Sequence, residues 1–205
     1  MPLIRKNNED KLYFIHIPRT AGRFINRILL NNNLQLTNDH FEKIDKDTGK
    51  EIPHLHYPYY KKYNPNNVPY FAVVRDPVNR FISAISQYSE SNFFLFNAND
   101  VFMNQNSFNN YVNNLNNTLK SNWFLPQHNF ITDEVNVWKF ENGFKDNFKK
   151  WFKEKFNTEL VFNDNFRGHI TYRDLAKRYN VKEEHIPLIK EYYKKDYELI
   201  TKVDN

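Results

Sequence analysis

Two histidines stand two positions apart in the segment Ile52-Pro-His-Leu-His-Tyr-Pro58. In an extended chain alternate side chains share a face, so His54 and His56 would point the same way. The reference pKa of histidine, near 6.5, suits proton abstraction at neutral pH, which makes either residue a candidate general base. The other interpretations are a metal pair, which lacks a third ligand motif, and a pair of surface histidines. The segment alone favours the surface pair.

A second segment, His16-Ile-Pro-Arg-Thr-Ala-Gly-Arg-Phe24, has the residue types of an anion-binding loop. If a helix starts within it, the first backbone N–H groups and the helix dipole attract negative charge. Gly22 lets the backbone approach an anion closely, Thr20 adds a hydroxyl, and Arg19 and Arg23 add positive charge. The segment is not a Walker A loop, because GxxxxGK[ST] is absent. An ordinary strand–helix turn with surface arginines explains it equally well.

The third segment is Val74-Arg-Asp-Pro-Val-Asn-Arg-Phe-Ile-Ser83. Arg75 and Ser83 would converge on an anion such as a phosphate, with the guanidinium making a forked contact. Alternatively, Arg75 pairs with Asp76 or a helix end, and Ser83 is a small residue where helices pack. Arg80 is predicted to be structural rather than a ligand contact.

Two strand–loop–helix units position the second and third segments. Residues 12–17 are β-branched and aromatic, which predicts a buried strand, and apolar residues at helical spacing then predict a helix over 24–31. Residues 70–74 predict a second strand. Asp76 and Pro77 start the next helix, as an N-cap carboxylate and a proline at the first helical position. Repeated units of this kind predict an α/β fold with a parallel sheet and ligands at the carboxyl ends of its strands.

The rest of the chain completes a single predicted domain spanning residues 1–205. Residues 92–122, rich in Asn, Phe and Ser, are interpreted as a loop-rich or weakly helical insertion. Residues 135–140 predict a third strand, and apolar residues over 144–156 fit an amphipathic helix. Apolar residues spaced 3, 4, 4 and 3 predict a closing helix over 183–200.

Composition narrows the class of protein. With 205 residues, 40% hydrophobic and 17% aromatic, the chain is not generically disordered. It has no cysteine, so disulfide frameworks, zinc–thiolate sites and thiol nucleophiles are excluded. No apolar run has the length of a membrane span or a signal peptide, which predicts a cytoplasmic protein without integral membrane association. The net charge of +5 favours an anionic partner.

Taken in order, the three segments resemble the sulfotransferases that use 3′-phosphoadenosine 5′-phosphosulfate (PAPS). Within that family they resemble the carbohydrate 2-O-sulfotransferase group of heparan and chondroitin enzymes. The first loop of that group, (F/V)-H-I-P-K-T-(A/G)-G-T, is similar to residues 14–23, and its (V/L)-R-D-P-x-x-R-x-x-S element matches residues 74–83. Between them the group places a histidine, sometimes as His-x-His. Phe140-Glu141 and the Tyr193–Tyr197 stretch are similar to its strand-end and closing-helix elements.

The resemblance implies a P-loop-like three-layer fold, with a central parallel sheet flanked by helices. It implies sulfuryl transfer from PAPS, which leaves as 3′-phosphoadenosine 5′-phosphate (PAP), to a hydroxyl acceptor that is expected to be a glycan, without a metal and without nucleic acid. The implied catalytic residues are His54 or His56 as base and Arg19 as charge clamp. The implied donor-binding residues are Arg19, Thr20, Ala21, Gly22, Arg23 and Phe24 at the 5′ end, and Arg75 and Ser83 at the 3′-phosphate.

Two residues depart from the family pattern. Arg19 stands where the family has Lys, and Arg23 stands where it has Thr or Ser, which puts the stabilisation of the leaving group in doubt. The alternatives are a non-catalytic relative that binds the donor or a glycan, a P-loop-like small-molecule kinase, and a nucleic-acid-binding module. Residues 92–122 are assigned to the acceptor cleft by position alone. A loop over residues 167–169 near the nucleotide is a further hypothesis, although a surface turn fits these residues better.

Overall fold

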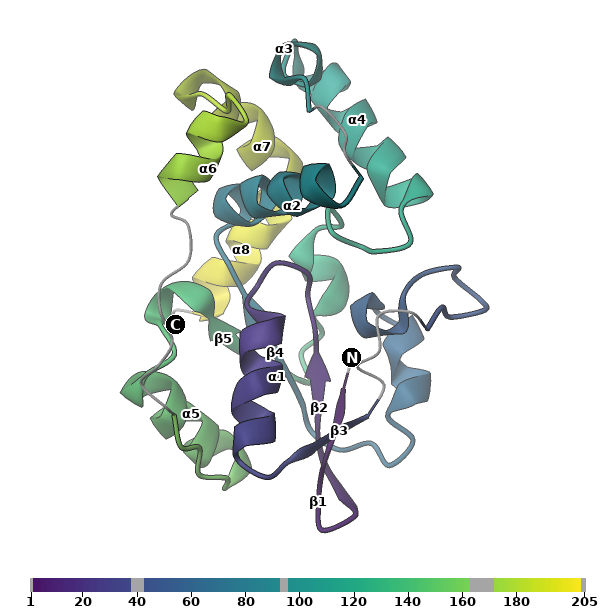
Figure 1. Cartoon of the computed structure of the whole chain (residues 1–205), viewed down its shortest axis with the longest axis vertical. Helices are drawn as coiled ribbons and strands as arrows, with labels where there is room; N and C mark the ends of the chain where they lie inside the picture. Colours follow the sequence, from purple (N-terminus) through teal and green to yellow (C-terminus); the bar gives the residue numbers. More distant parts are fainter. Residues whose placement is uncertain (1, 38–42, 93–95, 163–171, 204–205) are drawn as a thin grey trace.

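The computed structural model of the protein describes residues 2–37, 43–92, 96–162 and 172–203, and its centre is a five-stranded sheet (Figure 1). The strand order is β3-β1-β2-β4-β5. The strands are β1 (Leu3–Lys6), β2 (Glu9–Ile15), β3 (Gln35–Thr37), β4 (Tyr70–Val74) and β5 (Val135–Lys139). Strands β2, β4 and β5 are parallel, which confirms the predicted α/β fold. Strands β1 and β3, which were not predicted, add an antiparallel edge.

Alternating side chains of the sheet build a core on each of its faces. Phe14 and Phe71 face helices α1 (Gly22–Asn31) and α5 (Asp146–Phe156), which cover one side. Their neighbours Tyr13 and Tyr70 point to the other side. That side is covered by the 3₁₀ turn η2 (Tyr59–Tyr63), by η3 (Gln127–Phe130) and by helix α8 (Lys194–Val203). The predicted arrangement of a central sheet flanked by helices is therefore present.

The segment 92–122 is more helical than the sequence suggested. It contains α3 (Ala98–Val101) and α4 (Gln105–Thr118), and the side chains of Asn97 and Asn104 cap their N-termini. Phe108, Val112 and Leu115, at helical spacing, bury the inner face of α4. The asparagines on its other positions have modest helix propensity, but tertiary burial of the apolar face overrides it. Of the two predicted alternatives, the loop-rich one was wrong and the helical one is confirmed.

A separate cluster of helices surrounds α2 (Pro77–Asn92) at one end of the molecule (Figure 1). It includes α4, α6 (Tyr172–Arg178) and α7 (Ile186–Tyr192). The cap of α2 is as predicted, since the Asn79 amide donates to the Asp76 carboxylate over 2.8 Å. Within the described ranges, no helix combines the length and apolarity needed to cross a membrane.

The predicted closing helix is interrupted. Residues Glu183–His185 form a 3₁₀ turn, α7 ends at Tyr192, and α8 begins at Lys194. The Asp196 amide donates to the carbonyl of Tyr193, three residues back, which is the tighter 3₁₀ geometry. The apolar spacing did not reveal this break, because the buried stripe keeps its phase across it.

Candidate functional site

The loops that follow β2 and β4 meet at the carboxyl ends of these two strands. One guanidinium nitrogen of Arg75, Nη1, donates to the carbonyl of Arg19 over 3.2 Å. Nε of Arg19 in turn donates to Oγ of Ser83 over 3.0 Å, and its Nη1 donates to Gln87 over 3.0 Å. The structure therefore brings together Arg19, Arg75 and Ser83, which lie in two segments far apart in the sequence. Parallel strands place their following loops at one edge in this way.

Arg75 is held as a half-buried cation with unused hydrogen-bonding capacity. Its guanidinium lies 4.5 Å from the centre of the Phe140 ring, and its buried Nε atom has no hydrogen-bond partner among the residues that the structure describes. Burial lowers the pKa of Arg75, while the charges of Glu141 and Asp76 oppose that shift. Arginine still stays charged, so the buried Nε–H favours an incoming anion that would accept its hydrogen bond.

The backbone around Arg75 is fixed by Gln127. The Arg75 amide donates to Oε1 of Gln127 over 2.9 Å, and Nε2 of Gln127 donates to the Arg75 carbonyl over 2.7 Å. The buried Asp196 carboxylate accepts from the amides of Gln127 and His128 over 2.8 and 2.9 Å. It also pairs with Nδ1 of His128 at 2.9 Å. The last helix thus helps to set the position of the arginine.

Helix α1 starts directly in the first loop. Arg19 and Ala21 have left-handed backbones, with φ of 69° and 76°. The first turn of α1 has no side-chain cap and no acidic residue, so its N–H groups and dipole can receive an anion. The Thr20 hydroxyl is fully buried and donates to the Ile17 carbonyl over 2.8 Å, so its proton is already used within the loop. The Arg23 side chain is exposed.

The ring of Phe24 packs against another aromatic ring. Its centre lies 5.0 Å from that of Phe144, in an edge-on arrangement. Of the residues predicted at the 5′ end of the donor, Ala21, Gly22 and Phe24 would therefore contribute their backbone N–H groups. Arg19 and Arg23 are the ones whose side chains bring charge.

Gly22 provides the space that His16 occupies. A Cβ atom at residue 22 would lie 1.7 Å from Nε2 of His16. The buried His16 ring stacks on Phe14 at 5.6 Å and meets the His54 ring at 5.0 Å, so it has little freedom to move aside. The absence of a side chain at residue 22 thus lets the loop pack onto the histidines.

Gly22→Ala is therefore expected to destabilise the protein by about 1–3 kcal/mol, the usual cost of overpacking. Urea denaturation measures this change, and the loop should lose anion affinity as well. Arg23→Ala, one residue along α1, is the stability control, because its side chain is exposed. Unchanged stability of Gly22→Ala would show that the His16 contact is not confining.

The two predicted histidines have different environments. His54 is buried, and its Nδ1 lies 2.9 Å from a carboxylate oxygen of Glu51. His56 is half-buried, its Nδ1 lies 3.3 Å from Nδ2 of Asn122, and its ring is 5.2 Å from that of Tyr59. Burial lowers the pKa of both imidazoles. The Arg19 charge adds to the lowering at His54, whereas the charge that acts on His56 is Lys50.

Several residues of this site were not predicted. Glu51 is the N-cap residue of the 3₁₀ turn η1 (Ile52–His54) and precedes His54 by three positions, a separation at which side chains in this geometry lie one above the other. A carboxylate three residues before a candidate base is a signal that the sequence did contain. Asn122 and Gln127 reach the site by long-range folding, and no local pattern marks them.

Arg80 and Glu141 make hydrogen bonds to the backbone of other segments. Arg80 is buried and donates to the carbonyls of Trp123 and Leu125, as expected for a structural arginine. Glu141 accepts from the Asp76 amide over 2.8 Å, which places the strand-end element beside the start of α2. The hypothesis of a loop over residues 167–169 lies outside the described residues.

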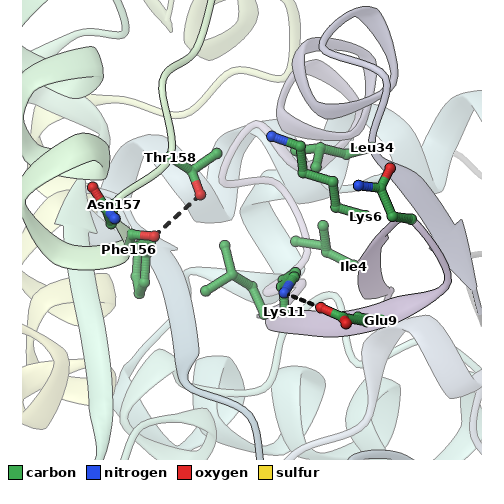
Figure 2. A pocket seen from close by; sticks show the side chains of 10 residues that line it. Ile4, Lys6, Glu9, Lys11, Leu34, Phe156, Asn157 and Thr158 are labelled. Carbon is green, nitrogen blue, oxygen red and sulfur yellow. Dashed lines mark hydrogen bonds and ion pairs between the residues drawn. The ribbon is translucent and has the colours of Figure 1, made fainter.

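A pocket of about 350 Å³ lies at the other end of β2, where this strand begins (Figure 2). It is lined by the start of β2, including Glu9 and Lys11, and by the residues after α5, Asn157 and Thr158. The Lys11 ammonium pairs with Glu9 there. None of the predicted site residues lines this pocket, so the candidate site is the loop edge at the carboxyl ends of β2 and β4.

Comparisons with known proteins concern the family of the whole chain rather than the location of the site. A family model described as "Sulfotransferase family" matches residues 3–200, nearly the whole chain. That span includes the loop after β2, the histidine segment and the loop after β4. No curated protein and no solved structure matches significantly.

Proposed function

The chain belongs to the sulfotransferase family, and from that premise we propose that it transfers a sulfuryl group from PAPS to a hydroxyl group of a carbohydrate. The observation that carries the choice of donor is the buried Nε of Arg75, which has no hydrogen-bond partner among the described residues. Arg75 also bonds to Arg19, just before α1, and Arg19 in turn bonds to Ser83. Two anion sites adjoin there, and a donor with phosphate at both its 3′ and 5′ positions would use both.

In this proposal the chain holds the donor at two points. Arg75 and Ser83 bind the 3′-phosphate, the former through its buried guanidinium. The backbone N–H groups at the start of α1 and the charge of Arg19 bind the 5′ end. In the structure the Arg19 side chain already bonds to Ser83, so it lies between the two points.

PAPS supplies an electrophilic sulfuryl group and a stable bisphosphate leaving group. His54 takes the proton of the acceptor hydroxyl as the new oxygen–sulfur bond forms and the bond to the 5′-phosphate oxygen breaks. Arg19 and the α1 N-terminus offset the charge that develops on that phosphate. Positioning and electrostatics provide the catalysis, as in phosphoryl transfer.

His54 is favoured over His56 because it is closer to the anion loop. Its ring contacts His16, which packs on Gly22, and the charge of Arg19 acts on it. His56 lies on the outer side, next to the exposed rings of Tyr57 and Tyr59. Amphipathic tyrosines of this kind suit the mixed apolar and hydroxyl surface of a sugar, which supports a carbohydrate acceptor.

Isothermal titration calorimetry with PAP and with adenosine 5′-phosphate tests the donor. PAP should bind at least about tenfold more tightly, since one charge-assisted hydrogen bond contributes about 1.5–3 kcal/mol. Equal affinities would overturn the assignment of PAPS. A parallel assay with ³⁵S-labelled PAPS and a mixture of unsulfated uronic-acid polysaccharides tests transfer, and mass spectrometry then locates the added group.

A kinase, a non-catalytic relative and a nucleic-acid-binding protein would each give a different result in binding and transfer assays. Family membership argues against a small-molecule kinase, and transfer of the γ-phosphate of ATP would revive it. A non-catalytic relative would bind PAP without transferring sulfur to the polysaccharides. Binding of oligonucleotides with a steep salt dependence would instead indicate a nucleic-acid partner.

A further inference from the structure

We infer that Glu51 is a positioning residue, whose carboxylate holds the His54 imidazole with its proton on Nδ1 and its lone pair on Nε2. The inference rests on the proposed function only in that the His54 ring then takes the proton of the acceptor hydroxyl. Its geometric basis is the 2.9 Å distance between the Glu51 carboxylate and Nδ1 of His54. A carboxylate accepts hydrogen bonds but cannot donate one, so the shared proton belongs to Nδ1.

The carboxylate is itself held in place by the residues that follow α4. The Ser121 hydroxyl donates to the same oxygen of Glu51, Oε2, that faces His54. The Glu51 amide donates to the Lys120 carbonyl over 2.9 Å. Nδ2 of Asn122 donates to the His54 carbonyl over 2.9 Å. Residues 120–122 therefore fix both the backbone and the ring partner of His54.

The second histidine has the opposite proton arrangement. Nδ2 of Asn122, which donates to the His54 carbonyl, also faces Nδ1 of His56 at 3.3 Å. An amide nitrogen is a donor, so Nδ1 of His56 accepts and its proton lies on Nε2. His54 thus offers a proton acceptor at Nε2 and His56 offers a donor there. The contacts of Glu51 and Asn122 therefore give the two rings opposite hydrogen-bonding properties at Nε2.

The charges around His54 agree with a neutral ring at neutral pH. Burial lowers its pKa, as does Arg19, and the hydrogen bond and charge of Glu51 raise it. The neighbouring His16 ring is kept neutral by its own burial, which lowers its pKa well below the usual range. Burial raises the pKa of Glu51, but the hydrogen bonds from His54 and Ser121 outweigh it, so the carboxylate stays ionised.

Long-range ¹H–¹⁵N correlation NMR of the free protein at neutral pH tests the inference directly, because it reads which ring nitrogen carries the proton. His54 should have Nδ1–H and His56 should have Nε2–H in the unaltered protein. In Glu51→Gln the neutral amide oxygen is a weaker acceptor than the carboxylate and the amide nitrogen can donate instead, so the population of His54 with Nδ1–H should decrease. Glu159→Gln is the control, since it removes an exposed carboxylate paired with Lys153 on α5. An unchanged His54 tautomer in Glu51→Gln would overturn the inference.

Kinetics add a readout that a purely structural role would not move. Glu51→Gln should lower kcat about 10- to 100-fold, part of the about 10²–10⁴ that a general base supplies, with PAP affinity unchanged. Because the carboxylate raises the pKa of His54, its removal should also move the acidic limb of the pH profile to lower pH. Glu51→Asp should restore part of the rate, whereas a full rate in Glu51→Gln would contradict the inference.

The two failures can be told apart. If no polysaccharide is sulfated but the tautomer still depends on Glu51, the proposed reaction fails and the Glu51–His54 pair stands. If transfer occurs and Glu51→Gln has the same tautomer, only the pair fails. Should Glu51→Gln not fold, Ser121→Ala removes one hydrogen bond from the carboxylate and should shift the tautomer equilibrium in the same direction. An unshifted tautomer in that variant would count against the pair.

Discussion

His54→Ala should lower the turnover of polysaccharide sulfation by about 10²–10⁴, the contribution that a positioned general base makes. The acceptor hydroxyl must lose its proton as it bonds to sulfur, and the substitution removes the imidazole that is proposed to accept that proton. PAP affinity should stay within about twofold, because no donor-binding role is assigned to the ring. Initial rates with ³⁵S-labelled PAPS and calorimetry with PAP measure the two quantities.

The matched control is His56→Ala, two residues away and half-buried. It should cost less turnover than His54→Ala if the buried ring is the base. The pH profile gives a second test. Burial lowers the pKa of His54, so the ring is neutral at pH 7, and turnover should fall only as the pH drops below about 6.5. A greater loss in His56→Ala than in His54→Ala would reassign the base.

Arg75→Ala should weaken PAP binding by about 10- to 150-fold, which corresponds to the loss of about 1.5–3 kcal/mol from one charge-assisted hydrogen bond. The guanidinium is half-buried against Phe140, and its Nε has no hydrogen-bond partner in the part of the chain that the structure describes. A 3′-phosphate would accept the hydrogen bond of this Nε–H group. Calorimetry with PAP and with adenosine 5′-phosphate measures the change for each ligand.

The comparison of the two ligands separates a direct contact from a structural effect. If Arg75 binds the 3′-phosphate, its removal should abolish the preference for PAP while changing adenosine 5′-phosphate affinity little. Equal losses for both ligands would show that Arg75 acts only through its bond to the Arg19 carbonyl. Arg75→Lys should give an intermediate affinity, because it keeps the charge without the fork. Arg178→Ala, an exposed arginine on α6, controls for the change in net charge.

The parts of the fold that could be predicted are those with strong local signals. Strand β4 has its predicted bounds because its five residues are all apolar and bounded by Pro69 and Arg75. Helix α2 starts where Asp76 and Pro77 indicate, since capping is a local interaction. Strand β1 has only four residues and β3 only three, too few for a period-2 pattern to stand out.

The site, too, has parts that local sequence signals predict and parts that they do not. Its three motifs could be read from residue types and order, but the contacts between them could not. The Arg19–Ser83 bond joins residues 64 positions apart, and the pairing of Asn122 with both histidines depends on where α4 ends. Residues 92–122, with many asparagines, were interpreted as a loop-rich or weakly helical insertion from their composition. Two of the asparagines prove to be helix caps, a role that depends on position rather than composition.

The buried Asp196 carboxylate has a thermodynamic consequence for the donor site. Its three contacts with Gln127 and His128 join α8 to the backbone of Arg75 through a continuous set of hydrogen bonds. Undocking α8 would carry the Asp196 carboxylate away from the amides of Gln127 and His128 and release the Gln127 clamp in the same event. The local unfolding of α8 and the release of the Arg75 backbone are therefore one event with one free energy of opening. A donor bound at Arg75 would raise that free energy for α8 as well, because Gln127 couples the two.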